Sequence, residues 1–369
     1  MRRILLRLGK RQRRLCRTLD APAGRLVQRT RMAVLSYFAP RLQQVLLVVL
    51  SGSLFLGSND LAAQDTPLSK TEVAQGQKIQ DHNTSYWRFG ISITNAGQAK
   101  GIVATSPVPI ECPEQTVELI QEEFGDGVKG VKVKPLKPLA RQMVFKIASL
   151  QPNQGGATAL TFKITKRQIS LPEDPGLFTF DPKPRGSLKK DFLGPSPFIE
   201  SKHDRISEIA KTLAEDHADK PAWDQVEAIY DWVRENVEYK FDRQIHSCLD
   251  ALDSGKGDCE ELSSLFIAIC RARGIPARAV WIPGHTYPEF YLLDENGDGQ
   301  WFPCQAAGSR QFGEMNERRP VLQKGDRFKV SGQKELQRYA QPTLKCKDAS
   351  AALGIEQIAE ELEAVASNE

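Results

Sequence analysis

The apolar residues of this chain change their spacing once, across a proline-rich segment, and this change limits the folds open to it. Between residues 85 and 169, apolar and polar residues alternate, as in half-buried β-strands. Residues 171–198 carry six prolines, and proline restricts its own backbone and that of the preceding residue. Beyond this linker, apolar residues recur at helical spacing. The order predicts a β-rich part, a linker and an α+β part.

The β-rich part spans residues 64–170, and its alternation predicts a sandwich-like domain. Glycine-containing breaks separate the candidate strands. Residues 115–123 are compatible with either a further strand or a short helix. The alternating apolar residues are Trp87, Phe89, Ile91 and Ile93, then Val131 and Val133, then Leu160, Phe162 and Ile164.

The α+β part spans residues 199–346 and contains two predicted helices. The first covers residues 223–237, where five apolar residues form one stripe. The second begins at Asp258-Cys259 and ends at Gly274, which supplies the stop signal. Strands are predicted at 277–282, at 289–293 and around Trp301. The acidic tail, residues 347–369, has amphipathic spacing that favours a peripheral helix.

Residues 1–63 resemble a targeting segment and are kept out of the fold prediction. They hold 12 basic and 2 acidic residues, and residues 45–57 form an apolar run shorter than the ~20 residues of a membrane-spanning helix. A signal peptide ending near Ala63 is expected, with a retained membrane anchor as the alternative. Translation begins at Met1 or at Met32, which starts a stretch of ordinary signal-peptide proportions. The protein is therefore expected to be exported.

The remaining chain shows no signature of nucleic-acid or metal binding. It is mildly acidic, so it offers no basic surface for nucleic acid. It has no C-x-x-C or H-E-x-x-H motif. Residues 294–299 match the start of a calcium-loop pattern, but its twelfth position is Gln305 rather than glutamate, which favours a hairpin tip. Six cysteines follow residue 63, and an exported protein can pair some of them, in an order the sequence leaves open.

Cys259 is the candidate nucleophile. It stands at the start of the second predicted helix, where free backbone N–H groups and the helix dipole favour a thiolate. A thiol nucleophile needs a base, and the chain has five histidines. His285, between two predicted strands and beside Gly284, is the best placed of them, and His246 is its one competitor.

Three motifs around these residues resemble the transglutaminase-like superfamily of papain-type thiol enzymes. The resemblance covers roughly residues 206–307 and does not extend to the β-rich part. The motifs are Gly255-Lys256-Gly257-Asp258-Cys259-Glu260-Glu261-Leu262, then Cys270-Arg271-Ala272-Arg273-Gly274-Ile275-Pro276-Ala277-Arg278, then His285-Thr286-Tyr287-Pro288-Glu289.

The resemblance implies a helix carrying the cysteine packed on an antiparallel sheet, with Cys259 as nucleophile and His285 as general base and acid. The family's orienting aspartate follows a Trp-x-Pro-x segment, and here Gln305 holds that position. An amide still accepts a hydrogen bond from imidazole but stabilises an imidazolium less than a carboxylate does.

The function expected from these features is acyl transfer from a peptide or glutamine amide through a Cys259 thioester. Hydrolysis is favoured over crosslinking because water is the default acceptor. The substrate partner is then a protein or peptide, no cofactor is implied, and the oligomeric state is open. The alternative is an inactive transglutaminase-like fold that acts as a binding or scaffold module, motivated by Gln305.

Overall fold

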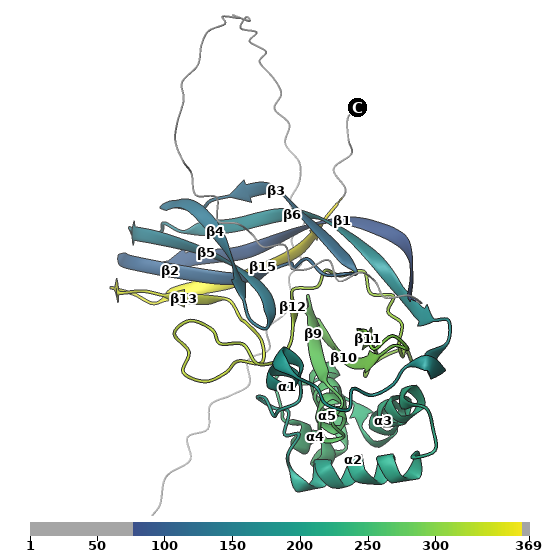
Figure 1. The fold of residues 1–369 in the computed structure, drawn as a ribbon. Coiled ribbons are helices and arrows are strands. Elements are labelled where there is room, and N and C mark those ends of the chain that lie inside the picture. Colours follow the sequence, from purple (N-terminus) through teal and green to yellow (C-terminus); the bar gives the residue numbers. More distant parts are fainter. Residues whose placement is uncertain (1–76, 364–369) are drawn as a thin grey trace, which may run out of the picture. The chain divides into compact units, whose positions relative to one another are not determined.

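The computed structural model describes residues 77–363, which form two large β-sheets, a two-stranded pair and a group of helices (Figure 1). The predicted targeting segment, residues 1–63, lies outside the described residues. None of the described helices combines the length and apolar character needed to cross a membrane.

The first sheet has four antiparallel strands in the order β15-β1-β6-β3. Its centre is the long antiparallel pair of β1 and β6. Alternate residues of β1 point to one face, and the four apolar residues predicted from the alternation are buried there. The strands are β1 (Gln77–Asn95), β3 (Gln115–Glu123), β6 (Gly156–Pro172) and β15 (Leu353–Leu362).

The second sheet runs from the α+β part into the β-rich part without a break. Its order is β11-β10-β9-β12-β5-β2-β13, with β4 beside β5 and β14 beside β2. The short strand β12 joins the two halves, because it pairs with β9 on one side and β5 on the other. The strands are β2 (Ala99–Val108), β4 (Val128–Leu136), β5 (Leu139–Leu150), β9 (Ala277–Ile282), β10 (His285–Leu293), β11 (Gly299–Pro303), β12 (Gln323–Lys324), β13 (Thr343–Lys345) and β14 (Asp348–Ala349).

The β-rich part is a sandwich, as the alternation predicts. Side chains from β1 and β6 of the first sheet and from β2 and β5 of the second form one apolar cluster. Phe89, Phe145 and Phe162 are among its fully buried members. Facing sheets that bury their alternate residues in this way explain the period of two in the sequence.

The helical group packs around α5, which begins at Cys259. Helices α2, α3 and α4 contact α5, and β9 and β10 lie beside it (Figure 1). Its residues from Glu261 to Arg271 are all buried, so it is the central element of its core. The helices are α1 (Gly186–Phe192), α2 (Asp204–Asp216), α3 (Ala222–Asn236), α4 (Cys248–Ser254) and α5 (Cys259–Ala272), with a 3-10 turn at Pro175–Leu177 and a short parallel pair of β7 (Glu238–Tyr239) and β8 (Lys256–Gly257).

The expectation of a helix in the acidic tail is wrong. Residues 353–362 form β15, which pairs with β1 over ten positions. The tail buries little on either face, so side-chain burial gives a helix no advantage, while pairing satisfies the backbone groups of an otherwise open edge. Residues 115–123, for which the sequence left two alternatives, form strand β3.

Candidate active site

A hydrogen-bonded cap fixes Cys259 at the first position of α5. The Asp258 side chain accepts from the Glu260 N–H at 2.7 Å, and the Asp258 N–H donates to Glu261 at 2.8 Å. The Glu261 N–H also donates to the Asp258 side chain, and this bond and the one from the Asp258 N–H to Glu261 make a capping box, which satisfies free donors of the first turn. Gly257 permits the approach, since a Cβ there would lie 2.7 Å from the Glu261 Cβ. The helix start predicted from the sequence is confirmed.

A tight hairpin brings His285 to the same place. Only Pro283 and Gly284 separate β9 from β10, and Gly284 has φ 69°, a conformation that suits glycine. His285 is therefore the first residue of β10, which begins four residues earlier than predicted. The backbone N–H of the next residue, Thr286, favours the ionised form of the Cys259 thiol.

Cys259 and His285 line one cavity of about 530 Å³. Gln305 completes the predicted set, because its Oε1 lies 2.9 Å from His285 Nε2. With Nε2–H donating to the amide oxygen, Nδ1 carries no proton and is free to act as a base. The structure thus brings the three predicted site residues together.

The main chain of Gln305 is held by α3. Its carbonyl oxygen accepts from the Tyr230 hydroxyl at 2.9 Å and from Arg234 Nη1 at 3.0 Å. The same hydroxyl accepts from the Gln311 N–H at 3.1 Å, which ties down the following loop. A fixed backbone leaves the Gln305 amide few alternative positions, so it can set the orientation of the imidazole.

The pKa of the Cys259 thiol is raised, whereas the position at a helix start predicts a lowered one. Burial raises the pKa of the thiol and the Thr286 N–H lowers it, while the carboxyl groups of Asp258, Glu260 and Glu261 raise it further, to about 11. The helix-dipole argument considered the backbone alone and left out these three acidic neighbours. The resting thiol is therefore protonated at neutral pH.

His285 is neutral at the same pH. Burial lowers its pKa below the ordinary 6.5, and this effect outweighs the hydrogen bond with Gln305. A neutral thiol and a neutral imidazole therefore line the same cavity.

Alkylation of Cys259 by iodoacetamide is expected to be slow at neutral pH and to rise about tenfold per pH unit toward pH 11. With a pKa of about 11, only ~0.1% of the thiol is ionised at pH 8, against about a quarter for a thiol of pKa ~8.5. Peptide mapping of labelled cysteines across pH 6–11 measures this. Fast labelling of Cys259 near pH 6 would show a thiolate–imidazolium pair and contradict the expectation.

The competitor from the sequence, His246, is not part of this cavity. The His246 ring lies 3.4 Å from Asp242, and its backbone N–H donates to Glu261. Cys304 is fully buried in the core and does not line the cavity. The six cysteines of the described residues are all free thiols.

The cavity also has an apolar rim that the sequence argument missed. Tyr239, Phe241 and Ile245 line it and are strongly exposed, Phe241 by 68%. A signal was available, because these three apolar residues interrupt an otherwise polar loop between α3 and α4. Exposed apolar side chains beside a nucleophile are a natural contact surface for substrate.

The described residues contain no group of three or more His, Cys, Asp or Glu side chains placed to hold a metal ion. Residues 294–299 form the tip of the β10–β11 hairpin, where the Asp294 side chain accepts from the backbone N–H groups of Asn296 and Asp298. The flanking elements are strands, as predicted for a hairpin tip.

Comparison with known proteins agrees with the motifs. Residues 208–306 match the model of the Transglutaminase-like superfamily. A "putative cysteine protease" from Cytophaga hutchinsonii superposes with a TM-score of 0.53 at 17% identity, covering 78% of this chain and 94% of that chain. This similarity supports the fold alone. No curated protein sequence matches the chain.

A second solved structure shows a weaker match. The periplasmic domain of TgpA from Pseudomonas aeruginosa, bound to ethylmercury, matches with a TM-score of 0.27 at 14% identity, covering 61% of this chain and 90% of that chain. A TM-score of this size does not bear on the fold. The resemblance to the transglutaminase-like superfamily is confirmed by the family model, over the segment that contains Cys259, His285 and Gln305.

Proposed function

We propose that this protein is an exported thiol hydrolase that cleaves amide bonds of a peptide or of a glutamine side chain. The observation that supports the proposal is one cavity lined by both Cys259, at the start of α5, and His285, whose imidazole is hydrogen-bonded to Gln305. Export rests on the basic, apolar segment before residue 63.

The chemistry follows from the protonation states. As the Cys259 sulfur attacks the carbonyl carbon, His285 takes the thiol proton, and a carbon–sulfur bond forms. Collapse of the tetrahedral intermediate breaks the carbon–nitrogen bond, and the imidazolium gives its proton to the departing amine. Water then attacks the thioester with His285 again as base, which releases a carboxylic acid and restores the thiol. Gln305 keeps Nδ1 available at each step.

Turnover of synthetic peptides by the full chain under reducing conditions tests the proposal. Between them the peptides should contain every amino acid, including glutamine, and product masses report cleavage or deamidation. Failure of the folded protein to alter any of them contradicts the proposal. The proposal predicts that at least one amide is cleaved or deamidated.

Two observations favour a second candidate, an inactive binding module. The raised pKa of Cys259 and the amide in place of a carboxylate at Gln305 both weaken a thiolate–imidazolium pair. A binding module predicts that Cys259→Ser leaves partner binding unchanged and that no amide is cleaved. The turnover experiment therefore distinguishes the two candidates, because the hydrolase predicts cleavage of at least one peptide and the binding module predicts none.

Replacing Gln305 by glutamate is expected to move the acid limb of the pH–rate profile upward by about one pH unit or more. In the native protein His285 must be neutral to act as base, and its lowered pKa places this limb below pH 6.5. A carboxylate 2.9 Å from Nε2 favours the imidazolium, so the base is lost at a higher pH. Measuring kcat/KM from pH 4 to 9 gives the shift.

The matched control is Gln311→Glu, which makes the same change in the same loop at a residue that contacts Tyr230 through its backbone. Its acid limb should stay in place. Equal profiles for both variants would show that Gln305 does not set the pKa of His285.

A further inference from the structure

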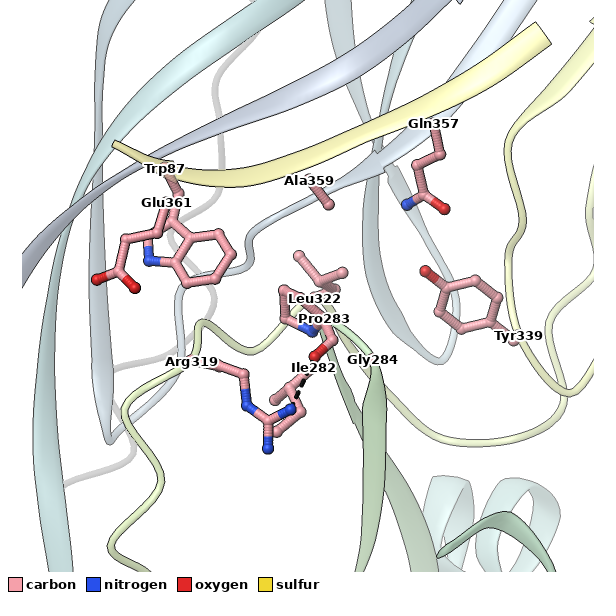
Figure 2. Close-up of a pocket in the computed structure, with 10 residues that line it drawn as sticks. All are labelled: Trp87, Ile282, Pro283, Gly284, Arg319, Leu322, Tyr339, Gln357, Ala359 and Glu361. Carbon is pink, nitrogen blue, oxygen red and sulfur yellow. Dashed lines mark hydrogen bonds between the residues drawn. The ribbon is translucent and has the colours of Figure 1, made fainter. Parts of the chain in front are cut away.

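A second cavity, of about 380 Å³, adjoins the one that holds Cys259. Both cavities are lined by Ile282, Gly284 and Tyr339, and Gly284 directly precedes His285. Figure 2 shows β15 and Trp87 on one side of this second cavity and the β9–β10 turn on the other. The two cavities therefore share a wall beside His285.

The pattern of β15 explains why this space is open. Its residues Gln357, Ala359 and Glu361 pair with Ile91, Phe89 and Trp87 of β1, so they point to the same face of the sheet. On β1 this face is buried against the second sheet, whereas the three β15 residues are exposed. The second sheet does not extend over β15, so Gln357 and Glu361 stay in contact with solvent although they lie on the face that is buried in β1.

The charges in this second cavity leave one carboxylate uncompensated. Arg319 is neutralised by Glu317, which lies 2.7 Å away, and it also donates to the Pro283 carbonyl oxygen at 3.0 Å (Figure 2). Glu361, by contrast, forms no ion pair with any of the side chains that the structure describes between residues 83 and 363. It neighbours Trp87 across the β1–β15 ladder.

A carboxylate next to an apolar wall suits a basic side chain. The carboxylate supplies a charge-assisted hydrogen bond, and the part of Trp87 that lines the cavity, although the residue is only 6% exposed, offers an apolar surface for the aliphatic stem. We propose that this cavity is a substrate subsite that takes a lysine or arginine side chain of an extended polypeptide whose scissile amide lies at Cys259. The inference deepens the proposed function and rests on it.

Tyr339 separates the basic subsite from the catalytic cavity. Its ring packs against Trp281 at 5.1 Å between centroids, and its hydroxyl lies against Gln357 of β15. It lines both cavities, so a chain that passes from Cys259 to Glu361 crosses it. A substrate that places a basic side chain at Glu361 would therefore also contact the apolar rim of the catalytic cavity at Phe241.

The test uses full-length Cys259→Ser protein, which holds peptides without cleaving them. Fluorescent ten-residue peptides of random sequence are bound and the retained fraction is sequenced. We expect enrichment of lysine and arginine, and Glu361→Lys should weaken binding of these peptides about tenfold or more and favour acidic ones. Glu361→Gln, a milder change at the same exposed site, should remove the preference without reversing it.

The matched control is Glu356→Lys, which makes the same charge change on the opposite face of β15, where Glu356 pairs with Ser92. It should keep the preference for basic peptides. The inference is overturned if no peptide is retained, if the retained peptides show no basic preference, or if Glu361→Lys and Glu356→Lys behave alike. Retention of basic peptides that the native protein does not cleave would instead reject the hydrolase and leave the subsite standing.

Discussion

Replacing Cys259 by alanine should abolish amide cleavage, lowering kcat/KM by more than about 10⁴-fold. The structure offers no second nucleophile in this role, because within residues 77–363 Cys259 is the one cysteine that lines the cavity with His285. Without the sulfur no thioester forms, and His285 alone must activate water against an intact amide. Initial rates on a cleaved peptide give the ratio.

Cys346→Ala is the matched control, since it removes another incompletely buried thiol from the opposite end of the second sheet. Its sulfhydryl hydrogen-bonds to the backbone oxygens of Lys100 and Asp348 and lies at the edge of the apolar cluster of the sandwich. This variant should keep the native rate, and both variants should keep the native melting temperature. A rate for Cys259→Ala within tenfold of the native one would remove Cys259 from the mechanism.

Replacing Lys324 by methionine should lower the free energy of unfolding by about 3–5 kcal/mol. Lys324 is buried and lies 2.7 Å from Glu114 and 2.6 Å from Glu289, and Arg278 also pairs with Glu289. Burial would lower the pKa of Lys324, but the two carboxylates outweigh it and raise that pKa. Removal of the ammonium leaves Glu114 buried without its cation.

The cost should be visible in urea denaturation as a lower midpoint with an unchanged slope. The matched control is Lys211→Met, because Lys211 pairs with Glu215 at 3.7 Å on an exposed helix face, where such pairs contribute about 0–1 kcal/mol. If both variants lost the same free energy of unfolding, the buried ion pairs of Lys324 would not stabilise the fold more than an exposed pair does. Since Glu289 lies on β10, four residues after His285, the same variant should also lower activity.

The helical core and its site were open to prediction because their signals are local. The stripe of α3 and the caps of α5 depend on neighbours within one or two turns. The resemblance then located Cys259, His285 and Gln305, and the hydrogen bond between the last two follows the position that the resemblance assigned.

The parts that escaped prediction depend on contacts between distant segments. Strand β15 forms because β1, more than 250 residues earlier, offers an open edge, and no local pattern records that edge. Lys324 and Glu114 look like ordinary surface charges in the sequence, and only the fold buries them together. The high pKa of Cys259 likewise comes from burial and from carboxyl groups placed by the cap.

The most direct measurement of the central claim is product analysis in water enriched in oxygen-18. The native chain and Cys259→Ala are incubated with the same peptides under reducing conditions, and the products are weighed by mass spectrometry. Hydrolysis through Cys259 predicts new carboxyl groups that carry one heavy oxygen, formed by the native protein alone. Unchanged peptides, equal cleavage by both proteins, or crosslinked peptides formed with loss of ammonia in place of hydrolysis would contradict it.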